Sequence, residues 1–375
     1  MAEKKTLWIK DLGGMIQRQD MDKIPDNMSP FLMNISLDKP GTWRKRKGSA
    51  LLDSTAAGSG TLGMIDYAAT DATTKLHAYR GTTLYTYTPS SYTSIDATDI
   101  TGTSKKVQSV NYLGRVYWVS PEDNLRYESG STTAQVLDNT GTQAGIKGNT
   151  IAVSQRTLFV GGSPDLGRDR VYYTSFDLTT FLGTHNFGPD EATWLFSSTT
   201  NFFSVETPVT AMISYGMNGL VYVFTKYSLY SFNMAYEDKA TGVNKELDIG
   251  CAGPRAVTIC NGILMWMDPE GRIWGWKGEG SASLMSYHIE DDSNGDAIIN
   301  KISATWIPEV AAGSLGSKVY FSIGDVTLWG VSYTNCVLVG QISPDASDIQ
   351  WSVYSYPLKP TIFTNAFLSG RKVLL

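Results

Sequence analysis

The chain has 375 residues, of which 42% are hydrophobic and 18% are charged, and its formal net charge at pH 7 is −5. Charged residues are scarcer than the roughly 25% of typical domains, and the 36 glycines and 20 tyrosines favour turns and strands over helices. A negative net charge argues against affinity of the whole chain for nucleic acid, although a local basic patch could still bind it.

The first 50 residues form no repeat and differ from the rest of the chain. Ser29 and Pro30 predict a short helix over residues 29–35, because serine caps helices and proline suits the first helical position. A tight turn is expected over residues 38–41. We therefore separate an N-terminal arm, residues 1–59, which we predict to be a docking segment, from residues 60–375, in which the pattern is different.

From about residue 60 a β-rich unit returns six times, with a short strand, a tight turn and a second strand that carries an aromatic residue. The clearest copies lie at residues 76–87, 112–119, 219–232 and 262–276, and looser copies lie at 155–173 and 317–329. Self-similarity at a fixed period of roughly 40–50 residues is typical of propellers. The pattern predicts an all-β fold, a single β-propeller of six blades, with five or seven as alternatives. The expected blades are residues 61–105, 106–147, 148–203, 204–249, 250–301 and 302–358.

Several segments interrupt this pattern. The third blade is long, which predicts inserted loops at residues 162–170 and 181–203. Residues 237–248 are polar and charged, and we expect a loop or a short helix there. The apolar end of the chain, residues 371–375, reads as one strand of a closing blade.

Two charged segments are candidate binding sites. The basic run Arg44, Lys45, Arg46 and Lys47 could contact phosphate, but a solvated turn, or pairing with the acidic loop of a neighbouring subunit, is the interpretation we favour. The acidic loop, residues 290–296, offers closely spaced carboxylates beside a turn glycine, which suits calcium. Its weak metal candidates are Asp292, Asn294 and Asp296, and a solvated loop is the favoured alternative.

Candidate catalytic residues are few. The three histidines fall in three different expected blades without ligand spacing, and the three cysteines show no paired CxxC spacing, so we expect buried or half-buried structural residues: His77, His185, His288, Cys251, Cys260 and Cys336. No nucleophile elbow or phosphate-binding loop occurs. We predict that the protein is not an enzyme and takes no cofactor.

Ten tryptophans invite a sugar-binding interpretation, because aromatic rings stack on apolar sugar faces. Most of them lie inside strand patterns, and blade packing is the expected explanation for Trp118, Trp266, Trp274 and Trp329. No apolar run reaches about 18 residues, so no transmembrane helix is expected. The N-terminus lacks the apolar core of a secretory signal, which predicts a soluble protein made in a cytoplasm.

The N-terminal segment carries the most specific motifs. Gly13-Gly14 opens it, residues 24–30 follow, and residues 41–48 close it with a glycine, the basic run and a second glycine. This order resembles the opening of structural proteins of tailed bacteriophages. Echoes of the same kind of protein lie at residues 170–175 and at 250–257 followed by 268–274. The chain looks like the β-propeller tail nozzle or tail-tube-extension family of short-tailed phages, although it is much shorter than the larger nozzles.

The resemblance implies a structural subunit of the virion tail, made in the host bacterial cytoplasm. Members of the family form a ring below the portal and adaptor, so the implied partners are further copies of the chain, with a hexamer favoured, and adaptor, portal or fibre subunits. DNA would pass only transiently through the channel. The alternative function is a carbohydrate- or receptor-binding propeller module of the phage tail, which needs a repeated polar pocket in each blade. A propeller glycosidase would need two carboxylates about 5–9 Å apart, and no motif suggests them.

Overall fold

A computed structural model describes residues 13–18, 23–25, 27–39, 42–46, 48–49, 60–68, 74–88, 91–96, 106–112, 114–128, 135–136, 146–154, 157–174, 202–216, 220–233, 242–290, 295–343, 348–368 and 371–375. The chain divides into two compact units. Unit 1 comprises residues 1–50 and 258–360, and unit 2 comprises residues 51–257 and 361–375. The division falls inside a single strand, β19.

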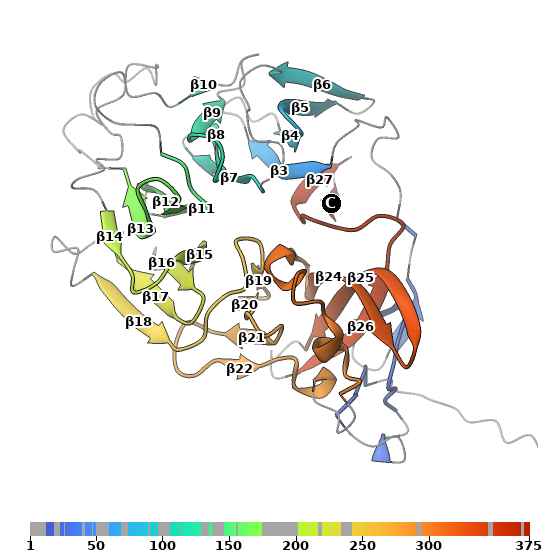
Figure 1. Ribbon diagram of the computed structural model, residues 1–375. Coiled ribbons are helices and arrows are strands. Elements are labelled where there is room, and N and C mark those ends of the chain that lie inside the picture. Colours follow the sequence, from blue (N-terminus) through green and yellow to red (C-terminus); the bar gives the residue numbers. More distant parts are fainter. Residues whose placement is uncertain are drawn as a thin grey trace, which may run out of the picture. The chain divides into compact units, whose positions relative to one another are not determined.

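Unit 2 contains four antiparallel sheets of four strands (Figure 1). Blade one consists of β3 (Thr61–Ala68), β4 (Thr74–Arg80), β5 (Thr83–Thr88) and β6 (Ser91–Asp96). Blade two consists of β7 (Gln108–Tyr112), β8 (Arg115–Val119), β9 (Arg126–Glu128) and β10 (Gln135–Val136). Blade three consists of β11 (Thr150–Ser154), β12 (Thr157–Ser163), β13 (Gly167–Tyr173) and β14 (Phe202–Ser204). Blade four consists of β15 (Val209–Tyr215), β16 (Leu220–Thr225), β17 (Leu229–Phe232) and β18 (Val243–Leu247).

The end of the chain adds a hairpin to unit 2. Strand β27 (Asn365–Leu368) pairs with β28 (Arg371–Leu374). The amide of Phe367 donates to the Asp66 carboxylate on β3 at 3.2 Å, so this hairpin lies beside the first strand of blade one.

Unit 1 contains two further four-stranded sheets and an N-terminal hairpin. Blade five consists of β19 (Val257–Cys260), β20 (Ile263–Met267), β21 (Ile273–Trp276) and β22 (Ser283–Leu284), and blade six of β23 (Ala312–Leu315), β24 (Lys318–Leu328), β25 (Val331–Ile342) and β26 (Ile349–Ser355). Three short 3-10 helices follow blade five and precede blade six in the chain: η3 (Tyr287–Ile289), η4 (Ile298–Lys301) and η5 (Ile307–Glu309). The hairpin consists of β1 (Ile35–Lys39) and β2 (Thr42–Lys45).

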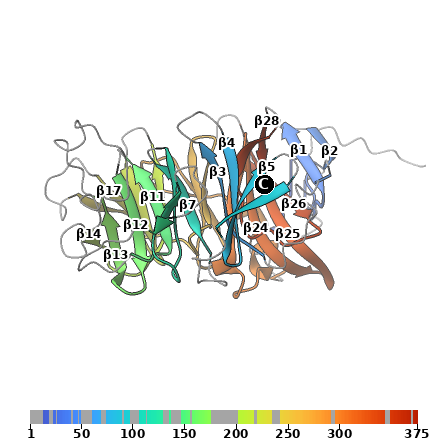
Figure 2. The same cartoon turned by 90° about the horizontal axis from the view of Figure 1, so that it is seen from above.

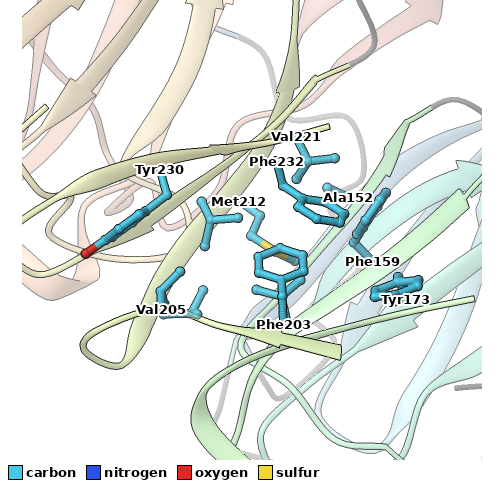
Figure 3. Close-up of a cluster of buried hydrophobic side chains, with 12 residues drawn as sticks. Ala152, Phe159, Tyr173, Phe203, Val205, Met212, Val221, Tyr230 and Phe232 are labelled. Carbon is cyan, nitrogen blue, oxygen red and sulfur yellow. The ribbon is translucent and has the colours of Figure 1, made fainter. Parts of the chain in front are cut away.

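These six sheets confirm the predicted all-β, six-bladed propeller arrangement. In three blades the second strand is buried at every position, namely β8, β12 and β20. Such strands carry near-continuous apolar runs because both faces of a blade are covered. In unit 2, side chains of blades three and four share one apolar cluster, in which the rings of Phe203 and Phe232 stack with centroids 4.0 Å apart (Figure 3).

Three local predictions were wrong. Residues 29–35 form no helix, because the backbone at Met33 bridges to Val353 of β26 and β1 begins at Ile35. Residues 162–170 are the tight β12–β13 hairpin and not an insertion. Residues 243–247 of the expected loop or helix are strand β18. In each case strand pairing with a neighbour outweighs local propensity. The second predicted insertion, 181–203, lies outside the described residues up to residue 201.

Candidate functional site

The N-terminal arm lies along the outer edge of blade six. The Met15 amide donates to the Trp351 carbonyl at 3.1 Å, and the Asn34 amide donates to the Val353 carbonyl at 2.7 Å. In return the Val353 amide donates to the carbonyl of Leu32 at 2.8 Å. An unpaired edge strand would expose a row of backbone donors and acceptors, and the arm covers this row on β26. Figure 2 shows β1 and β2 beside β26.

Apolar burial holds the arm as well as backbone pairing does. Met15, Ile16, Leu32 and Leu37 are all buried. Gln17 is also buried, and its side-chain oxygen accepts a hydrogen bond from the amide of Ile298 at 2.8 Å. The arm is therefore part of the packed structure of unit 1.

The described residues of the basic run, Arg44, Lys45 and Arg46, differ in their contacts and in their exposure to solvent. Arg46 faces inward: its guanidinium donates to the Ser355 carbonyl at 3.0 Å and lies 4.6 Å from the ring centre of Tyr356 and 5.2 Å from that of Tyr354. Arg44 and Lys45 are exposed on β2. Lys47 lies outside the described residues. The three described cations of this run, which look equivalent in the sequence, thus comprise an anchor, Arg46, and an exposed pair, Arg44 and Lys45.

The outer strand of the arm carries an exposed aromatic residue beside this pair. Trp43 is 53% exposed, next to Arg44 in the chain, and pairs across the hairpin with the buried Leu37. Tryptophan and arginine are the residue types that contribute most at protein interfaces. Because side chains alternate along a strand, Trp43 and Lys45 lie on one face of β2 and Arg44 on the other, and this exposed strand is the clearest candidate docking surface of the arm.

The acidic loop is paired within its own unit at both ends. Glu290 is buried, with a carboxylate oxygen 3.6 Å from Nε of Arg272, and Asp296 lies 3.1 Å from the ammonium of Lys301. The other metal candidates, Asp292 and Asn294, lie outside the described residues. In the part of the chain that the structure describes, no cluster of three His, Cys, Asp or Glu could hold a metal ion.

The described histidines and the three cysteines are buried or half-buried, as we predicted for structural residues. His77 is buried in blade one, and burial, aided by the charge of Lys75, lowers its pKa to about 4. His288 lies in η3, and His185 falls outside the described residues. All three cysteines are buried, as predicted, and none of them forms a disulfide. Burial raises the pKa of Cys260 to about 12 and that of Cys336 to about 11, so both thiols stay protonated at neutral pH.

Blade packing accounts for three of the four tryptophans. Trp118 and Trp266 are buried, and the half-buried Trp274 donates from Nε1 to the carboxylate of Asp268 at 2.8 Å. For Trp329 the prediction was wrong. It is 40% exposed, because it occupies the turn between β24 and β25 and not a strand.

Two side chains with structural roles were not singled out from the sequence. Asp268 accepts hydrogen bonds from the amides of Glu270 and Arg272 and so shapes the β20–β21 turn. Buried Arg255 donates to the carbonyls of Thr361 and Val107, each at 2.9 Å, and to that of Leu62. Both residues lie in the segments that echo the phage proteins, which was their one sequence signal.

Comparison with known proteins gives a likeness of fold. No family model matches the sequence, and no curated protein matches it. Among solved structures, a chain of the mitotic checkpoint complex is 10% identical, with a TM-score of 0.44 and coverage of 86% of this chain and 93% of that one. U3-55K is 9% identical, with a TM-score of 0.49 and coverage of 83% and 89%. A chain of the nidogen/laminin complex is 13% identical, with a TM-score of 0.42 and coverage of 77% and 97%.

Among the residues that the structure places, no helix has the length and apolar character to cross a membrane.

Proposed function

We propose that this chain is a structural subunit of a phage virion, a tail nozzle or another ring component of the tail that surrounds the DNA exit path. One observation supports the proposal above the others. The described residues of the segment that carries the resemblance, 12–48, are folded onto blade six through Met15, Asn34 and Arg46, and strand β2 leaves Trp43 and Arg44 exposed. An exposed strand that is anchored on a packed sheet in this way suits a docking surface.

The proposed mechanism is assembly. A ring requires head-to-tail contacts in which two different surfaces of each copy meet. Several blades end in a short outer strand, such as β10, β14 and β22, and the arm covers β26, so such contacts can form without uncontrolled strand pairing. The partners would be further copies of the chain and adaptor, portal or fibre subunits, with DNA passing only transiently during ejection.

Electron microscopy of the purified full-length chain tests the proposal. We expect rings, and we expect the purified chain to bind isolated phage tails from which it is absent. The matched variant Arg44→Glu/Lys45→Glu should reduce binding to tails, because it reverses the exposed charges and leaves Arg46 in place. A chain that stays monomeric, ignores tails and binds a bacterial polysaccharide on a glycan array would contradict the proposal and favour the receptor-binding alternative.

A further inference from the structure

The arm lies against a blade that is complete without it. Strands β23 to β26 form a four-stranded antiparallel sheet, and β25 pairs with β26 along the whole of β26 without a register shift. The arm adds to the free edge in the other direction, because Met33 bridges to Val353 in parallel. It is therefore a further segment on the edge of a finished sheet and not one of the four strands that build it.

The arm is also remote in sequence from everything that holds it. Unit 1 consists of residues 1–50 and 258–360, so the chain between these two parts, residues 51–257, belongs to unit 2. Hydrogen bonds of arm side chains to β24, β26 and η4 join residues that are 281 to 321 positions apart. The arm thus meets the rest of unit 1 as a separate segment of chain would.

Backbone pairing holds the arm in the manner of an added strand. The amide of Asn34 and the carbonyl of Leu32 both bond to the backbone of Val353, and the amide of Met15 donates to the carbonyl of Trp351. When an extended peptide adds to a sheet edge, these main-chain hydrogen bonds give affinity and the side chains give specificity. The contacts of the arm on β26 have this form.

Gly14 is the position at which the fit to β26 is closest. Its φ is 102°, in the region that favours glycine. An added Cβ would lie 3.1 Å from Cβ of Gln350 and 3.2 Å from both Cα of Gln350 and the amide nitrogen of Trp351. Two of these three atoms belong to the backbone of β26, which is fixed by its pairing with β25. The edge therefore selects glycine at this position of the arm.

The neighbouring glycine is not constrained in the same way. A Cβ added at Gly13 would lie 3.1 Å from Cε and Cγ of Met28. These atoms belong to a half-buried, flexible side chain of the arm itself, which can move aside. Substitution of Gly13 by alanine is thus a matched control for the same substitution at Gly14.

Further residues of the arm make the fit specific to its sequence. Gln17 is buried, its amide donates to the carbonyl of His288 in η3 at 2.7 Å, and its side-chain oxygen accepts from the amide of Ile298 in η4 at 2.8 Å. The buried apolar side chains of the arm are Met15, Ile16, Leu32 and Leu37. A glycine, two apolar residues and a glutamine in consecutive positions therefore each have a defined place.

We propose that the edge of β26, together with η3 and η4, is a peptide-binding site and that the arm is its resident ligand. The ligand is an extended peptide with the sequence Gly14-Met15-Ile16-Gln17 at its most specific part. This site does not depend on the proposed ring, because its contacts all lie within one chain. Strand β2 continues from the bound segment, so occupation of the site determines whether the exposed Trp43 is held against unit 1.

Fluorescence anisotropy of a labelled synthetic peptide of residues 10–48, mixed with the full-length chain, tests the site. A tethered ligand acts at an effective concentration on the order of millimolar, so the wild-type chain should take up little free peptide. In the Gly14→Ala chain, strain and overpacking weaken the tethered arm, and we expect the wild-type peptide to bind at least about 30-fold more tightly than to the wild-type chain. A peptide that itself carries Gly14→Ala should bind at least about 30-fold more weakly than the wild-type peptide. The Gly13→Ala chain should behave like the wild type.

Amide hydrogen exchange shows whether the site persists when the arm leaves it. In the Gly14→Ala chain the amides of Met15 and Val353 should exchange faster, while those of Leu338 and Val339 in β25 should stay protected. Loss of protection in β25, or failure of this variant to fold, would show that the arm is a structural strand of the blade and that the binding site is wrong. Unchanged exchange at Met15, no uptake of the wild-type peptide, or equal binding of the two peptides would overturn it as well.

Discussion

The guanidinium of Arg255 donates a hydrogen bond to the backbone carbonyl of Thr361 at 2.9 Å, joining two residues of unit 2 that are 106 positions apart. The same side chain reaches the carbonyls of Leu62 and Val107. Arg255 is 6% exposed, so a buried charged group donates to these carbonyls. One arginine fork therefore links the first strand of blade one, the start of blade two and the segment before the final hairpin.

Replacing Arg255 with methionine should destabilise the protein by about 2–5 kcal/mol, because the carbonyls of Thr361 and Val107 lose a charged donor while the apolar stem is kept. Chemical denaturation of the wild type, of Arg255→Met and of a control variant measures the change in the free energy of unfolding. Arg168→Met, at an exposed arginine near the start of β13, is the control and should cost less than about 0.5 kcal/mol. Equal stability of the two variants would show that the hydrogen bonds of Arg255 contribute nothing net.

Asp268 should tolerate alanine and asparagine equally poorly, although for different reasons. Alanine removes the acceptor of two turn amides and of the Trp274 indole N–H, which predicts a loss of about 2–4 kcal/mol. Asparagine can still accept from the amides of Glu270 and Arg272, but its NH₂ group then faces the indole N–H. Trp274→Phe combined with Asp268→Asn removes that conflict and should recover part of the stability in thermal unfolding. Failure of the double variant to recover any stability would contradict this account of the turn.

His77 should make unit 2 less stable in acid. Its pKa is lowered to about 4 in the folded chain, first by burial and then by Lys75, while the backbone of Tyr85 opposes the shift. The ordinary value is 6.5, so between pH 6.5 and 4 the unfolded chain binds a proton that the folded chain does not. Stability should therefore fall as the pH drops through this window, by about 3 kcal/mol in total, and level off below pH 4.

Denaturant unfolding of the wild type and of His77→Gln between pH 7 and 4 checks this. Glutamine does not titrate, so the difference in stability between the two proteins should shrink or reverse as the pH falls. Parallel pH profiles for the two would assign the acid sensitivity to other groups.

The basic run should separate into an anchor and an exposed pair under mutation. Arg46→Gln removes the hydrogen bond to Ser355 and the stacking on Tyr354 and Tyr356. Because a hydrogen bond from a charged group contributes about 1.5–3 kcal/mol, amide exchange at Asn34 should accelerate roughly tenfold or more. Arg44→Glu/Lys45→Glu should leave both this exchange and the melting temperature unchanged. Faster exchange in the double variant alone would reverse the assignment.

Repetition along the chain predicted the blades. Strand patterns and turns recur at a fixed spacing, and both depend on residues close in sequence, so blade boundaries could be predicted to within several residues. The same local rules failed over residues 29–35. Ser29 and Pro30 satisfy the preferences of a helix start, but the open edge of β26 offers backbone partners more than 300 residues away.

The candidate site depended on tertiary structure in the same way. The sequence alone predicted an all-β propeller of six blades, with five or seven as alternatives, and a distinct, basic N-terminal segment. It could not separate Arg46 from Arg44 and Lys45, because the carbonyl and rings that hold Arg46 belong to β26 and the residue after it. It also placed Trp329 inside a strand, since an apolar residue in an apolar run looks buried until the register of β24 and β25 places it in the turn. Local patterns set which elements form, and long-range pairing decides which of their side chains are covered.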